Sequence, residues 1–274
     1  MRRWRLNSGY NATTDQRRTK AGTIPMLKNY MERDLGFFGD PWTPAQISTA
    51  LWLDANDSST ITIATGVSTW ADKSGNGNNA TQGTAANQPT YSSTGFNSKP
   101  TIQFDGTNDS FSLAGITQTS GQNVFAVVDT TLIGTSYRVF LNRSDPNSPA
   151  LYLSSTLNYR PISYWLADYA RWGAAIQRKA IIRWANYTSP FTFALVQVDG
   201  GVQTSQVSTT SVLSSWTNIN SSVVQQSRIN LSELIITTAD PTSETRQLIE
   251  GYLAWKWGLE ANLPSDHPYK NSAP

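Results

Sequence analysis

The stretch Val67–Thr81, VSTWADKSGNGNNAT, decides how the rest of this 274-residue chain is interpreted. A short β-branched run ends at Trp70, a polar segment follows, and Ala80 and Thr81 leave that segment. The polar segment contains Asn76-Gly77, and Asn-Gly is a strong hairpin signal because both residue types tolerate positive φ. The stretch predicts a strand, a rim loop and a return strand, although an ordinary β-turn has the same spacing.

Short apolar runs separated by turn residues extend on both sides of this stretch. Ala50–Asp54 (ALWLD) precedes it, and Asn123–Asp129 (NVFAVVD) is almost continuously apolar, as expected of a strand buried on both faces. Arg228–Thr237 is predicted to be a last long strand with a bulge near Glu233. The Ser/Thr/Asn-rich segment Ser205–Ser222 is interpreted as a loop or a weak edge strand.

Two further turns support an antiparallel arrangement. Pro100–Asp105 alternates apolar and polar residues, is expected to turn at Gly106, and continues in a return strand from Phe111. A second hairpin signal stands at Val198–Gly200. Many short strands at turn-marked spacing predict an all-β, two-sheet antiparallel sandwich.

One α-helix is predicted, over residues 242–257. Asp240-Pro241-Thr242 offers a cap and an early proline, Glu244 lies near the positive end of the helix dipole, and Gly258 supplies the stop. The domain organisation expected is an N-terminal basic arm and linker over residues 1–43 and a sandwich over residues 44–274 that includes this helix.

Composition narrows the class of protein. Apolar residues make up 38% of the chain and charged residues 15%, with 10 Trp, 11 Tyr and no cysteine. This composition is more typical of a β-rich surface protein than of a cytosolic enzyme, and it excludes disulfides and thiolate metal sites. No apolar run reaches the roughly 18 residues of a membrane-spanning helix, and the basic N-terminus lacks the apolar segment of a secretory signal peptide.

The first 40 residues have a different composition from the rest of the chain. They contain eight Lys/Arg and four Asp/Glu and show no sustained strand or helix period. The acids dilute the basic residues, so nucleic-acid binding is not predicted. The expected role is anchoring to a neighbouring subunit or particle, with these candidate contact residues: Arg2, Arg3, Trp4, Arg5, Arg17 and Arg18.

Several of these stretches, taken together, resemble a known family. Ala50–Asp54, Trp70–Gly77, Phe104-Asp105-Gly106 and Val198-Asp199-Gly200 resemble laminin-G-like, concanavalin-A-like jelly rolls. EGYLAWKWGL, which starts at Glu250, and LPSDHPY, which starts at Leu263, resemble the ends of such domains in tailed-phage and bacterial proteins. The resemblance covers about Pro44 to Pro274 and implies a jelly roll with the helix packed against its edge. In phages such domains resemble virion surface parts.

Enzymatic activity is not predicted. The concanavalin-A-like fold also occurs in glucanases, which need two carboxylates flanking the scissile bond. The five glutamates of this chain lack the E-x-D-x-x-E spacing, and Glu233 is expected to face solvent or a backbone partner. His267, the only histidine, is expected to be packed or hydrogen-bonded, and no G-x-S-x-G elbow accompanies it.

Two ligands remain as hypotheses. The resemblance to laminin-G-like domains implies calcium at a rim, where hard oxygen ligands stand in two turns: Asp72 and Asn76, with Asp105, Asn108 and Asp109. The same residue types also make local hydrogen bonds in turns. No other cofactor is expected. In the aromatic-rich middle of the chain, Tyr169, Arg171 and Trp172 are candidates for a glycan or subunit contact.

The sequence and the resemblance together favour a structural, non-enzymatic phage virion protein, most simply a capsid decoration or head surface protein anchored by its N-terminal arm. Its expected partners are the major capsid protein or other virion proteins and further copies of itself, with neither nucleic acid nor membrane. It would be made in the host cytoplasm and reside on the particle surface. The alternative is a carbohydrate-binding adhesin module of a phage tail or fibre.

Overall fold

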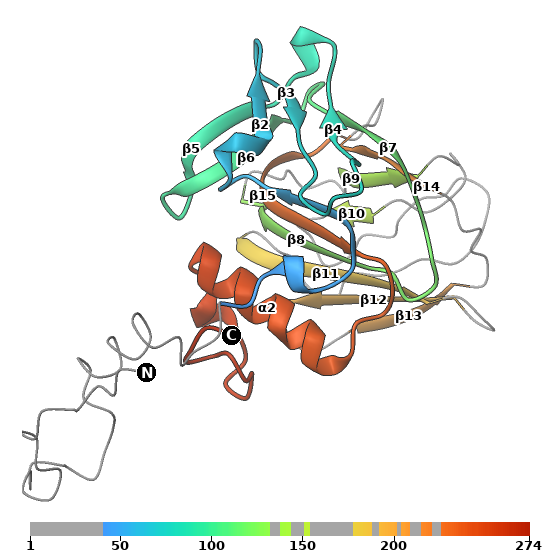
Figure 1. Ribbon diagram of the computed structural model, residues 1–274, viewed down its shortest axis with the longest axis vertical. Helices are drawn as coiled ribbons and strands as arrows, with labels where there is room; N and C mark the ends of the chain where they lie inside the picture. Colours follow the sequence, from blue (N-terminus) through green and yellow to red (C-terminus); the bar gives the residue numbers. More distant parts are fainter. Residues whose placement is uncertain are drawn as a thin grey trace, which may run out of the picture. The chain divides into compact units, whose positions relative to one another are not determined.

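A computed structural model of the chain describes residues 41–131, 138–143, 151–153, 178–187, 192–201, 204–208, 215–220 and 226–274. The described strands form two antiparallel sheets (Figure 1). Sheet A contains β1 (Thr49–Asp54), β5 (Thr90–Phe96), β6 (Lys99–Asp105), β8 (Asn123–Asp129), β11 (Lys179–Tyr187), β12 (Thr192–Val198), β13 (Thr204–Ser208) and β15 (Arg228–Thr237). Sheet B contains β2 (Ile61–Ile63), β3 (Val67–Trp70), β4 (Ala80–Thr81), β7 (Phe111–Thr117), β9 (Arg138–Arg143), β10 (Leu151–Leu153) and β14 (Ser215–Ile219).

Short 3₁₀ turns and one α-helix complete the described elements. The 3₁₀ turns are η1 (Pro44–Gln46), η2 (Ser58–Thr60), η3 (Ala85–Asn87) and η4 (Glu260–Asn262). The helix α2 (Ser243–Trp257) begins after Thr242, whose hydroxyl accepts a hydrogen bond from the amide of Thr245, and ends at Gly258 with φ of 68°. The predicted all-β sandwich with a C-terminal helix is therefore confirmed. None of the helices in the described part of the chain is long and apolar enough to cross a membrane.

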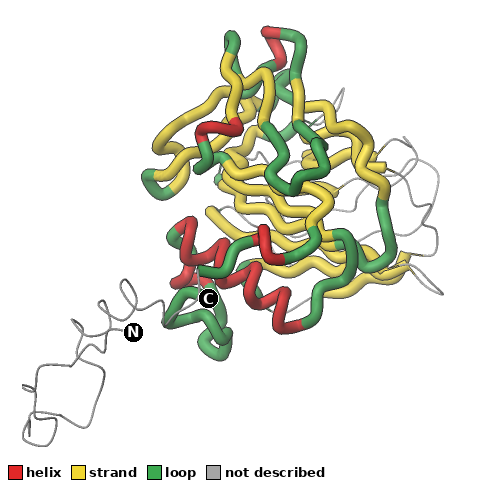
Figure 2. The backbone as a smooth tube through the Cα atoms, in the orientation of Figure 1, coloured by secondary structure: helices red, strands yellow, loops and turns green. Residues whose placement is uncertain are grey.

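Sheet A lies between sheet B and α2, and this position explains the apolar run of β8 (Figure 2). All seven residues of β8 are buried. Val124, Ala126 and Val128 pack in the core between the two sheets, whereas Phe125 and Val127 pack in a second core under α2. Because successive side chains of a strand point to opposite faces, a strand covered on both sides needs apolar residues at every position.

Strand β15 occupies the centre of sheet A. Its residues from Asn230 to Ile236 pair with β8 on one side, and on the other side its first half pairs with β6 and its second half with β1. The register against β8 shifts between Leu231 and Glu233, so the predicted bulge is present. The register against β1 places Asp54 directly opposite Glu233.

One interpretation of the sequence is wrong, and a second is right only in part. Strands β6 and β7 flank the turn at Gly106, but they lie in different sheets, so this turn crosses the sandwich and makes no hairpin. The segment Ser205–Ser222, interpreted as a loop or a weak edge strand, contains most of β13, which is an edge strand of sheet A, but it also contains β14, which lies inside sheet B between β9 and β7. Its side chains Trp216 and Ile219 enter the core, and this burial outweighs the polar composition around them.

Candidate functional site

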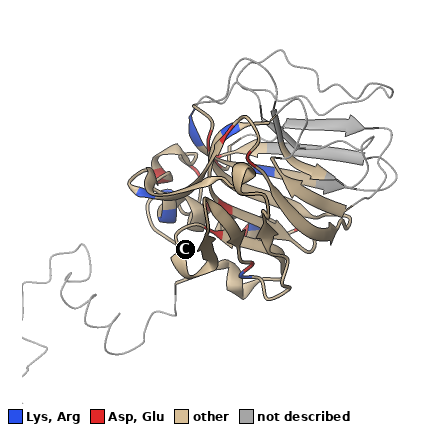
Figure 3. Ribbon diagram, turned by 90° about the horizontal axis from the view of Figure 1, so that it is seen from above, with Lys and Arg blue, Asp and Glu red and all other residues tan. Residues whose placement is uncertain are grey.

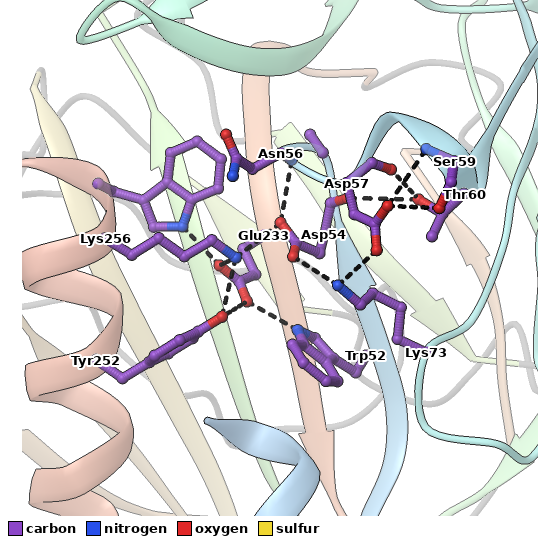
Figure 4. Close-up of polar contacts among 12 residues, drawn as sticks. Trp52, Asp54, Asn56, Asp57, Ser59, Thr60, Lys73, Glu233, Tyr252 and Lys256 are labelled. Carbon is purple, nitrogen blue, oxygen red and sulfur yellow. Dashed lines mark hydrogen bonds and ion pairs between the residues drawn. The ribbon is translucent and has the colours of Figure 1, made fainter. Parts of the chain in front are cut away.

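The site that gathers the most charge in the described structure lies between sheet A and α2 (Figure 4). Its ionisable members are Asp54 at the end of β1, Glu233 on β15, Lys256 in the last turn of α2, and Lys73 and Asp57 in loops beside β1. We call these five residues the Glu233 cluster. Charged residues are otherwise sparse over the described strands (Figure 3).

The bulge in β15 and the pairing with β1 aim two carboxyl groups at α2. Leu234 packs towards sheet B, so its neighbours Glu233 and Ile235 lie on the helix side. Trp52 on β1 is also on the helix side, and Asp54, two residues further along the strand, shares its face. The expectation that Glu233 faces solvent or a backbone partner is therefore wrong, since its side chain is completely buried.

Four donors converge on the Glu233 carboxylate. Its Oε1 accepts from the indole Nε1 of Trp52 at 2.8 Å and from the Tyr252 hydroxyl at 3.2 Å. Its Oε2 accepts from the indole Nε1 of Trp257 at 2.6 Å and lies 2.8 Å from Lys256 Nζ. Burial raises the pKa of Glu233, the Lys256 ammonium opposes part of that rise, and Asp54 adds to it.

Lys256 connects the two facing carboxylates. Its Nζ lies 2.7 Å from Asp54 Oδ1 and 2.8 Å from Glu233 Oε2, and it also donates to the Tyr252 hydroxyl at 2.9 Å. Two like charges directly across a strand pair repel, so the ammonium between them stabilises the β1–β15 register. Burial and the nearby charges of Glu233 and Asp54 raise the pKa of Tyr252, so its hydroxyl remains protonated.

Lys73 binds the outer side of the same cluster. Its Nζ lies 3.0 Å from Asp54 Oδ2 and 2.8 Å from Asp57 Oδ2. Burial alone lowers the pKa of Lys73, but hydrogen bonds and attraction from Asp57 and Asp54 outweigh it and raise that pKa. Hydrogen bonds from Lys73 and Ser59 lower the pKa of Asp57 from 3.8 to about 2. The cluster thus holds three acids and two lysines.

The calcium candidates Asp72 and Asn76 hold the loop between β3 and β4 against β1. Asp72 Oδ1 accepts from the amides of Trp52 and Ser74, both at 2.9 Å, and its Oδ2 accepts from Asn78 N at 3.0 Å and from the Ser74 hydroxyl. The Asn76 side chain donates to the carbonyl of Thr49 at 2.8 Å. In this loop Gly75 and Gly77 take φ of 87° and 73°, conformations that favour glycine.

The other calcium candidates, Asp105, Asn108 and Asp109, share the turn after β6. Asp105 Oδ1 accepts from the amide of Thr107 at 2.7 Å and of Asn108 at 3.3 Å, and Asp109 Oδ2 accepts from the amide of Asp105 at 2.8 Å. Among the residues that the structure describes, no group of three or more His, Cys, Asp or Glu side chains is arranged to hold a metal ion. Calcium binding stays a prediction.

His267 is buried, as expected, and its Nε2 lies 3.2 Å from Glu250 Oε2. The remaining candidates lie outside the described residues. These are the anchoring residues Arg2, Arg3, Trp4, Arg5, Arg17 and Arg18 and the contact residues Tyr169, Arg171 and Trp172. Their roles stay predictions.

Sequence reasoning missed the Glu233 cluster, although two signals for it were present. An acid inside the apolar run of β15 needs buried partners, since burying an unpaired charge is costly. Tyr252 and Lys256 are four positions apart on α2 and therefore lie on one helix face. Which residues of β1 are partners of Glu233 depends on the pairing of β1 with β15, and local spacing in the sequence does not reveal that pairing.

No protein-family model matches this sequence, and a search of curated proteins found no match. Among solved structures, a Trypanosoma rangeli sialidase in complex with sialic acid matches at TM-score 0.50 and 17% identity, over 84% of this chain and 38% of the sialidase chain. The receptor binding domain of botulinum neurotoxin D matches at TM-score 0.50 and 11% identity, over 74% of this chain and 52% of that domain. The chain thus spans about two fifths of the sialidase and half of the toxin domain, and these matches show a shared β-sandwich, jelly-roll-like fold.

Proposed function

We propose that this chain is a non-enzymatic β-sandwich module that works by attachment and recognition. The observation that carries the proposal is the complete burial of the Glu233 side chain. A glycosidase presents two carboxyl groups to a sugar on either side of the scissile bond. Glu233 is completely buried, and all four of its donors come from the fold itself. That carboxylate supports the fold and is closed to a substrate.

The first form of this proposal is a structural protein of a phage virion, such as a capsid decoration protein. Its support is the resemblance of EGYLAWKWGL and LPSDHPY to domain endings in tailed-phage proteins, together with the basic composition of residues 1–40. In this form the sandwich covers the particle surface, and Arg2, Arg3, Trp4, Arg5, Arg17 and Arg18 bind the major capsid protein, another virion protein or a neighbouring copy.

Cosedimentation with particles stripped of this protein tests the first form. The full chain is compared with a chain lacking residues 1–40, after circular dichroism has established that both are folded. Saturable pelleting of the full chain alone is the expected result, because the basic arm supplies the contacts. Equal pelleting of both chains, or of neither, would contradict anchoring by the arm.

The second form is a carbohydrate-binding adhesin module. It is favoured by the shared fold with a sialidase and with a toxin receptor binding domain, at identities that bear on fold alone. The candidate contact residues are Tyr169, Arg171 and Trp172. A glycan array probed with the full chain tests it. Binding of the full chain to a glycan supports the adhesin if Trp172→Ala abolishes that binding and Trp255→Ala, which alters an exposed tryptophan of α2, does not. Absence of binding to every glycan would reject it.

A further inference from the structure

The inner part of the Glu233 cluster brings an amine, a carboxyl group and a second acid into direct contact. Lys256 Nζ lies 2.7 Å from Asp54 Oδ1 and 2.8 Å from Glu233 Oε2. The three side chains come from α2, β1 and β15, and their exposed fractions are 16%, 5% and 0%. The structure therefore holds two groups that can condense, and a proton carrier, away from solvent.

A lysine amine and an aspartate carboxyl group form an amide when water is released. In solution the reaction is negligible, because the ammonium is not a nucleophile and the two groups meet rarely. Fixing two reactants in contact is worth several orders of magnitude in rate, and a positioned acid that moves the protons adds about 10²–10⁴-fold. The inner cluster supplies both conditions.

We propose that Lys256 Nζ and Asp54 Cγ condense to an intramolecular isopeptide bond, with Glu233 moving the protons. Glu233 takes one proton from the ammonium and passes it to the Asp54 carboxylate. The free amine attacks Asp54 Cγ and forms the C–N bond. A second amine proton then passes through Glu233 to the departing oxygen, the C–O bond breaks, and one water molecule leaves. Glu233 ends in its starting state, and no oxidant or reductant is consumed.

The surroundings of Glu233 suit this role. Burial raises the pKa of its carboxyl group, which makes it a stronger proton acceptor towards the ammonium beside it. The indoles of Trp52 and Trp257 and the ring of Tyr252 enclose it, and each donates a hydrogen bond that fixes its orientation. The aromatic walls also favour release of the water that the condensation produces.

The outer lysine provides an internal contrast. Lys73 also contacts two carboxylates, Asp54 and Asp57, but the side chain of Asp57 is 34% exposed and its pKa is lowered to about 2. Such a carboxylate is a poor proton acceptor, and water competes for it. Lys73 therefore remains an ion pair, whereas Lys256 reacts.

The bond would tie the end of β1 to the last turn of α2 and close most of the sandwich into one covalent ring. Cross-links that close long loops stabilise a fold mainly by restricting its unfolded state, in the chain-entropy account. The sequence has no cysteine, so this chain makes no disulfide of its own that could serve the same purpose.

Mass spectrometry of the full natural chain under denaturing conditions tests the proposal. The expected intact mass is lower than that of the sequence by one water molecule, and a protease digest yields a branched peptide joining the segments of Asp54 and Lys256. Asp-Gly sequences such as Asp105-Gly106 can also lose water as succinimides, and the branched peptide separates the two events. Full intact mass, with both residues in linear peptides, would overturn the proposal.

Three variants assign the roles. Lys256→Arg keeps the positive charge but cannot condense with Asp54, and Glu233→Gln removes the proton carrier. Both variants are therefore expected to show the full intact mass of their sequences, without loss of water. The matched control Lys73→Arg alters the outer lysine and is expected to lose water as the natural chain does. Water loss in a folded Glu233→Gln variant would overturn the role of Glu233. If that variant does not fold, the intact mass of the natural chain still shows whether the isopeptide bond forms.

Discussion

The two faces of sheet A are buried in different ways. On the face towards sheet B, Leu231, Leu234 and Ile236 of β15 lie in an apolar core. On the face towards α2, apolar residues such as Phe125 and Leu253 share a core with Trp52 and Trp257, whose indoles donate to Glu233. An apolar interface gains stability in proportion to the area it buries and is permissive about register, whereas a buried charge requires its partners at fixed positions. We infer that packing against sheet B supplies most of the stability and that the Glu233 cluster fixes the position of α2 on sheet A.

Removing the central acid is expected to have the largest effect. Glu233→Ala takes a partner from Lys256 and the acceptor from two indole N–H groups, and removing one partner of a buried charged group costs about 3–5 kcal/mol of unfolding free energy. Loss of the proposed Lys256–Asp54 bond would add to this cost. Urea denaturation followed by tryptophan fluorescence measures it. The control Glu244→Ala removes an exposed acid from the first turn of α2 and is expected to cost about 1 kcal/mol or less. Equal losses in both variants would contradict the central role of Glu233.

The apolar face is tested at the next residue of the same strand. Leu234→Ala opens a cavity between the sheets, and such truncations cost about 2–5 kcal/mol. The two faces are expected to differ in how they affect the packing of α2. Leu234→Ala is expected to leave α2 packed on sheet A, whereas Glu233→Ala is expected to loosen that packing. Hydrogen exchange of the α2 amides, measured at matched stability, separates the two. Equal loss of protection in both variants would remove the distinction between the faces.

The loop between β3 and β4 gives a smaller expected effect. Asp72→Ala removes the acceptor for the amide of Trp52 and for two amides within the loop. Leaving such donors unpaired costs about 1–3 kcal/mol. The thermal midpoint of the variant is compared with that of Asp266→Ala, which alters an exposed acid near the C-terminus. No difference between these variants would mean that the loop contributes little to holding β1.

The smallest effect is expected from the outer ion pair under acid. The folded pKa of Asp57, about 2, is below its ordinary value of 3.8, so the stability it contributes is present above pH 3.8 and disappears as the pH falls to 2. Because the side chain is partly exposed, this contribution stays below about 1 kcal/mol. Asp57→Asn is therefore expected to flatten the loss of thermal stability between pH 4 and pH 2. An unchanged acid profile would show that the pair is fully screened.

Local signals in the sequence predicted the elements that depend on local chemistry. The cap and stop residues gave α2 to within one residue, and the continuous apolar run of β8 indicated burial on two faces. The bulge near Glu233 was also predicted. The direction of Glu233 was not, because it follows from the pairing of β1 with β15. The crossing of the chain between sheets after β6 was missed for the same reason: turn residues indicate a turn and leave open which sheet receives the next strand.

The position of β15 has a consequence for the making of the protein. This strand is the centre of sheet A, joining β8 to β6 and β1, yet it follows every other described strand in the sequence and is synthesised after them. Its partner Trp52 is 181 residues ahead of Glu233. A nascent chain therefore emerges from the ribosome with edges of β1, β6 and β8 unpaired and cannot close sheet A until β15 has been synthesised. Folding that depends on such distant contacts is slow and exposes strand edges to association, so we expect the growing chain to need chaperone protection.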